Sequence, residues 1–245
     1  MWSPGCGAPR GAANIEPVSR IAIVIPALDE EEAIGLVIQE IPPVVSEIVV
    51  VDNGSRDRTA AVARAAGARV VLEPRRGYGQ ACLTGIAAVP DAEIIAFLDA
   101  DHSDYPGQLV DVLAPILAGE ADFVVGSRNL GQRTRGSHPL HAVWGTRLCV
   151  GLMNLFIGTQ ATDLGPFRAI TATALRDLGM RDRNFGWTVE MQVKAARRGL
   201  RVREVPVDYR PRIGQSKVSG TLSGTVRAGA KILGTIARHA LSRTG

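Results

Sequence analysis

Residues 94–101 have the sequence Ile-Ile-Ala-Phe-Leu-Asp-Ala-Asp, a short apolar run that ends in two carboxylates one residue apart. Short apolar runs without alternation are typical of strands that are buried on both faces of a sheet. If the chain stays extended beyond Leu98, the side chains of Asp99 and Asp101 project to the same side. The stretch therefore predicts an inner strand of a mostly parallel sheet, with a pair of carboxylates at its carboxyl end.

Four further runs rich in Val and Ile predict the other strands, and they lie at residues 21–25, 47–51, 69–72 and 123–125. Apolar residues at helical spacing predict a helix over residues 34–41, and a capping residue before an Ala-rich stretch predicts another over residues 55–66. This alternation predicts an α/β fold with a doubly wound sheet flanked by helices. Such sheets bind ligands at the carboxyl ends of their strands.

The second half of the chain departs from the alternation. It predicts helices at residues 140–157, 188–198 and 221–241, and two short strands over residues 201–209 that Pro206 separates. The first nineteen residues are rich in Gly and Pro and lack the continuous apolar core of a signal peptide. We therefore expect a disordered lead-in, one α/β domain and a C-terminal amphipathic helix, over residues 1–19, 20–219 and 220–245.

Composition and charge narrow the class of protein. Cys6, Cys82 and Cys149 lie far apart and indicate neither a zinc site nor a disulfide framework. Residues 181–245 carry 14 Lys and Arg against 4 Asp and Glu, which predicts an anionic partner at this end. Aromatic residues make up only 4% of the chain, and with no nucleic-acid-binding motif we expect no nucleic acid partner. No apolar run reaches the length of a membrane-spanning helix, so we expect a cytoplasmic protein whose contact with an anionic membrane face is at most peripheral.

Polar clusters follow the first, second and fourth predicted strands. They are Pro26-Ala27-Leu28-Asp29-Glu30-Glu31, Asp52-Asn53-Gly54-Ser55 and Asp99-Ala100-Asp101. Two carboxylates that face one way repel each other, and Mg²⁺ or Mn²⁺ relieves that repulsion while substrate phosphates and water complete its coordination. The alternative for the third cluster is a solvated turn.

With the three clusters in this order, residues 21–219 resemble family 2 of the nucleotide-sugar glycosyltransferases. Members of this family have a Rossmann-like GT-A fold and carry P-A-x-N-E, D-D/N-G-S and D-x-D segments in that order. Residues 75–81 also resemble the family's glycine-containing loop before a helix. The resemblance implies that Asp99 and Asp101 bind Mg²⁺ or Mn²⁺. It also implies a nucleotide-sugar site formed by Pro26, Ala27, Glu30, Asp52, Gly77, Asp99, Ala100 and Asp101.

Some of these positions have other interpretations or depart from the family. Glu30 also opens a helix, and Asp52 also caps the next one. Leu28 stands where the family often has an aromatic residue, Asp29 where it often has Asn, and Ser103 where lipid-phosphate members often have Gln. His102 adjoins the carboxylates, but strand alternation points its side chain away from them.

Two later segments resemble the polyprenyl-phosphate sugar synthases of this family, which include dolichol-phosphate mannose synthase. Residues 162–168 resemble D-x-x-x-G-F-R with Pro166 as a departure, and residues 212–217 match R-x-G-x-S-K. Residues 126–128 match the G-S-R segment of family 2. The resemblance implies acceptor binding by Arg128, Asp163, Arg168, Glu190, Arg212, Ser216 and Lys217. Arg128, Arg212 and Lys217 would join Asp99 and Asp101 as catalytic residues. A surface salt bridge for Arg128 and a solvated basic loop for residues 210–219 are the alternatives.

The implied activity is an inverting, metal-dependent hexosyl transfer from a GDP-mannose or UDP-glucose type of donor to a polyprenyl phosphate. An ionised phosphate acceptor needs no strong base. The first alternative is a hydroxyl acceptor, in polysaccharide, glycolipid or small-molecule glycoside synthesis, for which Glu190 or Asp163 would be the base. The second is a catalytically silent nucleotide-binding GT-A module. The C-terminal helix would lie in a membrane interface or pack on the domain, since its cations lie opposite an apolar face.

Overall fold

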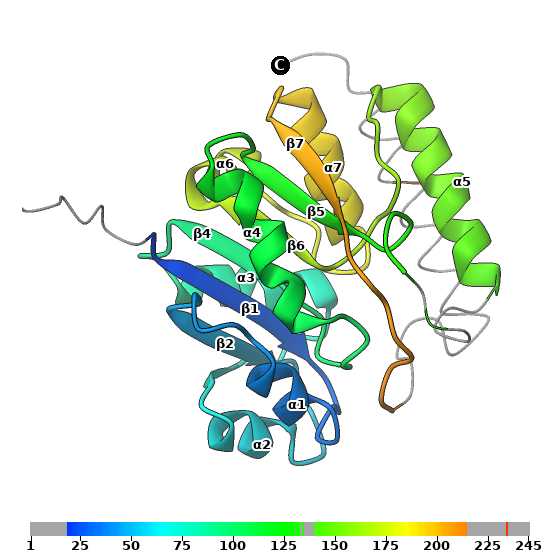
Figure 1. Cartoon of the computed structure of the whole chain (residues 1–245). Coiled ribbons are helices and arrows are strands. Elements are labelled where there is room, and N and C mark those ends of the chain that lie inside the picture. Colours follow the sequence, from blue (N-terminus) through cyan, green and yellow to red (C-terminus); the bar gives the residue numbers. More distant parts are fainter. Residues whose placement is uncertain (1–18, 133, 135–139, 215–233, 235–245) are drawn as a thin grey trace, which may run out of the picture.

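The computed structural model describes residues 19–132, 134, 140–214 and 234. The described part contains a seven-stranded sheet in the order β3-β2-β1-β4-β6-β5-β7 (Figure 1). The strands are β1 (Ile21–Ala27), β2 (Glu47–Asp52), β3 (Arg69–Leu72), β4 (Ile94–Phe97), β5 (Phe123–Ser127), β6 (Arg168–Thr171) and β7 (Val202–Pro206). Strand β6 runs antiparallel to β4 and β5, and the other paired strands are parallel. The predicted α/β fold with a mostly parallel sheet is confirmed.

Helices cover both faces of this sheet. One face carries α1 (Ile34–Gln39), α2 (Thr59–Ala65) and α4 (Leu109–Leu117), and the other carries α3 (Tyr78–Ala88), α6 (Ala172–Leu178) and α7 (Trp187–Arg197). Alternate side chains of β1 divide between the two layers, because successive residues of a strand face opposite ways. Ile23 and Ile25 belong to the core under α1 and α4, whereas Ala22 and Val24 belong to the core under α3. Burial on both faces explains the unbroken apolar runs of the sequence.

A further helix, α5 (Leu140–Ile157), lies outermost and runs beside α7 (Figure 1). Its residues Cys149, Val150 and Met153 form a small core with Val189 and Val193 of α7. Among the described residues, none of the helices has the length and apolar character that crossing a membrane requires.

Several elements differ from the prediction. The predicted pair of strands over residues 201–209 is one strand, β7, and Tyr209 forms only an isolated bridge with Asp104, because the chain leaves the sheet after Pro206. Helix α2 begins at Thr59 instead of Ser55, since side chains of residues 55–59 bind the loop after β1. The sequence did not predict β6. The predicted lead-in and C-terminal helix lie outside the described residues, except for residues 19 and 234.

Candidate active site

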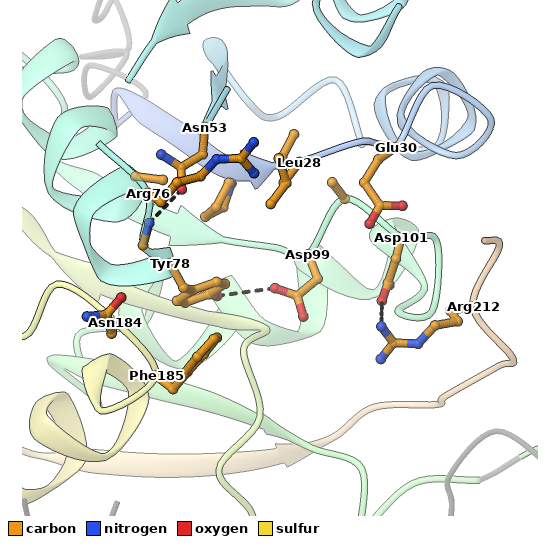
Figure 2. Close-up of a pocket in the computed structure, with 15 residues that line it drawn as sticks. Leu28, Glu30, Asn53, Arg76, Tyr78, Asp99, Asp101, Asn184, Phe185 and Arg212 are labelled. Carbon is orange, nitrogen blue, oxygen red and sulfur yellow. Dashed lines mark hydrogen bonds and ion pairs between the residues drawn. The ribbon is translucent and has the colours of Figure 1, made fainter. Parts of the chain in front are cut away.

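The carboxyl ends of β1, β2 and β4 border a pocket of about 290 Å³ (Figure 2). These strands are parallel, so their ends meet at one edge of the sheet, where α/β folds bind ligands. The pocket brings together distant parts of the chain, and its lining residues are Pro26, Ala27, Leu28, Glu30, Asn53, Arg76, Gly77, Tyr78, Ala81, Asp99, Ala100, Asp101, Asn184, Phe185 and Arg212.

Asp99 and Asp101 follow β4, and both line this pocket. Asp99 Oδ1 accepts a hydrogen bond from the Tyr78 hydroxyl at 3.2 Å. Asp101 Oδ1 accepts hydrogen bonds from the Ser103 backbone N at 3.0 Å and hydroxyl at 2.5 Å, and Asp101 Oδ2 forms an ion pair with Arg212 Nη1 at 2.9 Å. Burial and the neighbouring charge of Asp101 raise the pKa of Asp99 to about 7. The negative charge on Asp99 is therefore unfavourable here, and a bound cation would stabilise it.

The donor set of this pair fits a hard divalent cation. Mg²⁺ and Mn²⁺ prefer oxygen ligands and commonly take one or two carboxylates, with phosphate and water oxygens in the remaining positions. In the part of the chain that the structure describes, no three His, Cys, Asp or Glu side chains gather into a metal-binding group. Arg212 already places a cationic group on one oxygen of Asp101, which shows that this oxygen is accessible to a positive charge. Asp99 and Asp101 would thus hold a metal jointly with a phosphorylated ligand.

The strap, which we define as residues 207–213, leads from the end of β7 to these carboxylates. Its backbone follows the turn after β4 through an isolated bridge and two hydrogen bonds, namely Asp104 with Tyr209, Arg210 N to Ser103 O at 2.9 Å, and Ile213 N to Asp101 O at 2.9 Å. The Arg210 side chain donates to the His102 carbonyl and the Glu40 carboxylate, each at 2.7 Å. These contacts hold Arg212 at the rim of the pocket.

The loop after β1 carries Glu30 into the pocket. Side chains of the β2–α2 loop accept hydrogen bonds from three consecutive backbone N–H groups of this loop, Ser55 from Asp29, Thr59 from Glu30 and Asp57 from Glu31. Backbone bonds of this kind fix the path of a loop independently of its own side chains. The first two polar clusters of the sequence are thus tied directly to each other.

Within the second cluster, Asn53 lines the pocket and Asp52 does not. Asp52 Oδ1 accepts a hydrogen bond from Ser55 N at 2.9 Å. Asn53 Oδ1 accepts from Gly77 N at 2.8 Å, and its amide nitrogen donates to the carbonyls of Glu73 and Arg75. Asn53 therefore joins the end of β2 to the glycine-containing loop before α3, a role that the sequence did not predict.

The glycine-containing loop needs its glycines because another backbone lies against it. A Cβ at Gly77 would overlap with the carbonyl oxygen of Arg183, and one at Gly79 would overlap with that of Asp182. Gln80 N donates to Arg183 O at 2.9 Å. This contact brings Asn184 and Phe185 to the pocket, on the same side as Tyr78 in Figure 2. Neither of these two residues carries a sequence signal that marks it as a site residue.

The predicted acceptor residues Arg128 and Asp163 face each other instead of lining the pocket. Arg128 donates from Nε and Nη2 to the two carboxylate oxygens of Asp163 at 2.7 and 2.8 Å. Their side chains are 10% and 0% exposed. Burial alone would raise the pKa of Asp163, but Arg128 and the backbone N–H groups outweigh it and hold this pKa below its usual value. The pair ties the end of β5 to the loop before β6.

Two further predicted acceptor residues are also bonded to the protein. Arg168 is buried and donates to the carbonyls of Gly165 and Thr188 at 3.0 and 3.1 Å. Glu190, near the start of α7, accepts from the backbone N–H groups of Arg181 and Asp182. Ser216 and Lys217 lie outside the described residues. The pocket thus contains the predicted donor residues except Asp52, and Arg212 from the acceptor set.

Known proteins share this architecture. The model of glycosyl transferase family 2 matches residues 22–179. A glycosyltransferase of Mycobacterium bovis is 40% identical over 213 residues, which cover 85% of this chain and 94% of that protein. A dolichyl-phosphate hexose transferase of Haloferax volcanii is 30% identical over 213 residues, which cover 83% of this chain and 89% of that protein.

A solved structure of glucosyl-3-phosphoglycerate synthase from Mycobacterium tuberculosis, in complex with Mn²⁺, UDP-glucose and phosphoglyceric acid, also matches the fold. The TM-score is 0.75 at 23% identity, and the match covers 96% of this chain and 87% of that one. At this identity the likeness shows a shared fold.

Proposed function

This chain belongs to glycosyl transferase family 2, and from that premise we propose that it transfers a hexose from a nucleoside diphosphate sugar to a polyprenyl phosphate. The transfer is a single inverting displacement that requires Mg²⁺ or Mn²⁺. One observation carries the proposal: Asp99, Asp101 and Arg212 meet in one pocket at the carboxyl edge of the sheet. Two carboxylates and a guanidinium are the groups that a metal-bound diphosphate requires.

The donor occupies the pocket between the loop after β1 and the glycine-containing loop. Pro26, Ala27 and Leu28 supply an apolar wall for the nucleoside, and Asn53 and Arg76 supply polar groups beside it. The diphosphate lies toward Asp101 and Arg212, which are the groups that would face a metal ion and a phosphate. The pocket therefore separates a region for the base from a region for the charged groups.

Asp99 and Asp101 would hold the metal, which would supply positive charge to the departing diphosphate. Arg212 supports the same charge because a guanidinium pairs with phosphate oxygens in two parallel hydrogen bonds. Tyr78 holds Asp99 from the opposite side through its hydroxyl. Attack from the face opposite the leaving group then inverts the anomeric centre.

The acceptor proposal is supported by the state of the two candidate bases. Asp163 is paired with Arg128, and Glu190 accepts hydrogen bonds from backbone N–H groups, so neither is poised to remove a proton from a hydroxyl. An ionised phosphate attacks without such a base. The dolichyl-phosphate hexose transferase from Haloferax volcanii supports the same acceptor class. Contact of Arg128, Asp163, Arg168, Glu190, Ser216 and Lys217 with the acceptor stays a prediction.

We place the enzyme in the cytoplasm, with peripheral contact at the membrane face where a polyprenyl phosphate presents its head group. The second candidate is transfer to a hydroxyl of a small phosphorylated acceptor. The glucosyl-3-phosphoglycerate synthase structure favours it, because that complex contains phosphoglyceric acid. Arg212 would then bind the phosphate of the acceptor, and the attacking hydroxyl oxygen would lie elsewhere on the acceptor.

Transfer of labelled hexose from GDP-mannose and UDP-glucose tests the proposal, with Mn²⁺, Mg²⁺ or chelator present and the product mass measured. The acceptors are a short polyprenyl phosphate, the matching polyprenol and 3-phosphoglycerate. We expect metal-dependent transfer to the polyprenyl phosphate alone. Transfer only to 3-phosphoglycerate would establish the second candidate. No transfer and no donor hydrolysis with any of them would indicate a nucleotide-binding module instead of an enzyme.

A further inference from the structure

The Asp101 carboxylate, which would bind the metal, already has a partner within the protein on each of its two oxygens. Asp101 Oδ2 is paired with Arg212 Nη1 at 2.9 Å, and Asp101 Oδ1 accepts two hydrogen bonds from Ser103. The Asp101 side chain is 8% exposed and that of Arg212 is 33% exposed. A metal ion that enters the pocket must therefore compete with Arg212 for Asp101 Oδ2.

The strap keeps this pairing in place by backbone contacts. Ile213 N donates to Asp101 O, and Arg210 N donates to Ser103 O, so residues on both sides of Arg212 are bonded to the turn that carries Asp101. These bonds do not involve the Arg212 side chain. The guanidinium also interacts with the Tyr209 side chain, and it can change partner while its backbone stays beside the carboxylates.

The second partner available to Arg212 is the diphosphate of the sugar donor. This step of the argument rests on the proposed function. A guanidinium and a divalent cation repel each other and compete for one carboxylate oxygen. A diphosphate offers Arg212 a planar, bidentate partner with more charge than a single carboxylate. Arg212 lines the same pocket as the proposed phosphate region, so both partners are within reach of its side chain.

We propose that Arg212 is a placeholder cation, which occupies Asp101 until a nucleoside diphosphate draws it away and opens the carboxylate to the metal. Metal and nucleotide then bind interdependently. Each ligand strengthens the binding of the other by removing a contact that Arg212 makes when the pocket is empty, so the coupling between metal and nucleotide is favourable. The metal alone binds weakly, and the pocket avoids two adjacent unpaired carboxylates when no ligand is present.

Mn²⁺ titrations of the full-length protein test this inference without any turnover. Free Mn²⁺ is followed by electron paramagnetic resonance with no nucleotide, with UDP and with GDP, against protein-free blanks. The variants are Arg212→Ala, Arg212→Lys and the matched control Arg76→Ala, which removes one positive charge from the same pocket but no contact to a carboxylate, since Arg76 donates to the Gly54 carbonyl. Melting temperatures establish that each variant is folded.

Without nucleotide, we expect Arg212→Ala to bind Mn²⁺ about fivefold more tightly than the wild type, Arg212→Lys to lie between them, and Arg76→Ala to match the wild type. With UDP or GDP, the advantage of Arg212→Ala disappears or reverses, so the coupling between metal and nucleotide falls about tenfold.

Three outcomes of the comparison between variants would overturn the inference. They are equal or weaker Mn²⁺ binding by Arg212→Ala without nucleotide, the same gain with and without nucleotide, and an equal gain in Arg76→Ala. Absence of Mn²⁺ binding in every variant would overturn it as well. If neither nucleotide binds the wild type, the proposed function and the coupling both fail, while the titration without nucleotide still decides whether Arg212 and the metal compete.

Discussion

The carboxylates after β4 and the Arg128–Asp163 pair after β5 lie at the same edge of the sheet, yet the protein satisfies them differently. Asp163 is fully buried, and it accepts hydrogen bonds from two nitrogens of the buried Arg128 guanidinium. Asp99 receives one hydroxyl, and Asp101 shares one oxygen with a partly exposed arginine at the pocket. A charge that is paired with a buried partner supports the fold, whereas a charge in a pocket that has few partners, or a partner that is partly exposed and can move, is available to a ligand.

The pKa values express the same contrast. Arg128 holds the pKa of Asp163 below its usual value in spite of burial, whereas burial and Asp101 raise the pKa of Asp99 to about 7. The first carboxylate is stabilised by its neighbours and the second is destabilised by them. Perturbation by unsatisfied like charges in a pocket is a mark of functional sites. Substitutions in the two regions should therefore separate activity from stability.

The largest effect is expected for Asp101→Ala. It removes the proposed ligand of a metal that would neutralise the leaving group, and we expect hexosyl transfer to fall about thousandfold, or about 4 kcal/mol of transition-state stabilisation. The melting temperature should stay close to that of the wild type, because the variant also removes one of two repelling carboxylates. Asp111→Ala, an exposed position on α4, is the control. Near-normal turnover of Asp101→Ala in the presence of chelator would contradict the assignment.

For the Arg128–Asp163 pair we expect the main effect of a substitution to be on stability instead of on activity. Arg128→Ala leaves the Asp163 carboxylate buried without its partner, and we expect unfolding in urea to require about 3–5 kcal/mol less free energy. Arg201→Ala breaks an exposed ion pair with Asp122 and should cost at most about 1 kcal/mol. A soluble Arg128→Ala variant with wild-type stability but no activity would show that Arg128 acts on the substrate instead of on the fold.

Local patterns in the sequence predicted the strands that border the pocket and several of the residues that line it. The runs that became β1, β2 and β4 are buried on both faces, so their apolar character is unbroken and their polar ends are distinct. Asp99 and Asp101 were recognisable as a carboxylate pair directly after an apolar run, although β4 ends at Phe97 and Asp101 lies in the turn that follows it, so strand alternation does not set their directions. Glu30 and Gly77 were recognisable from the family resemblance, and both line the pocket.

The rest depends on contacts between distant segments. Arg128 and Asp163 are 35 residues apart, and nothing in either motif indicates that they pair with each other. Phe185 reaches the pocket because backbone atoms of the loop before α7 bond Glu190 on one side and meet Gly79 on the other. Strand β6 starts with a buried arginine and pairs antiparallel between β4 and β5, which no four-residue pattern predicts.

The loop that holds Phe185 reaches the pocket through its contact with the glycine-containing loop, and Gly79→Ala tests that contact. A Cβ at this position would overlap with the Asp182 carbonyl, so the loop must shift, at a cost of about 1–3 kcal/mol in unfolding free energy. We expect nucleotide affinity, measured by isothermal titration calorimetry, to fall more than tenfold. Gly107→Ala has open space around its Cβ and serves as the control. Unchanged affinity in Gly79→Ala would place the loop outside the nucleotide site.

The smallest expected effect is the pH dependence of stability in chelator. Asp99 has a pKa of about 7 in the folded protein, whereas its ordinary pKa is 3.8, so between pH 4 and 7 the folded state keeps a proton that the unfolded state has lost. The unfolding free energy therefore falls as pH rises through this window. We expect a slope of about 1 kcal/mol per pH unit within this window, measured by urea unfolding at successive pH values.

Asp99→Asn should flatten this slope in part, because burial and the charge of Asp99 also raise the pKa of Asp104, whose two carboxylate oxygens have no hydrogen-bond partner in the described structure. Asp163 gives the opposite sign: its pKa is lowered, so its contribution to stability is present above about pH 4 and is lost as the pH falls further. Asp163→Asn should therefore change stability near neutral pH more than in acid, whereas Asp99→Asn should change it near neutral pH in the stabilising direction. An Asp99→Asn profile parallel to that of the wild type would mean that the carboxylate after β4 is satisfied by the protein, as Asp163 is, and would remove the distinction between the two regions.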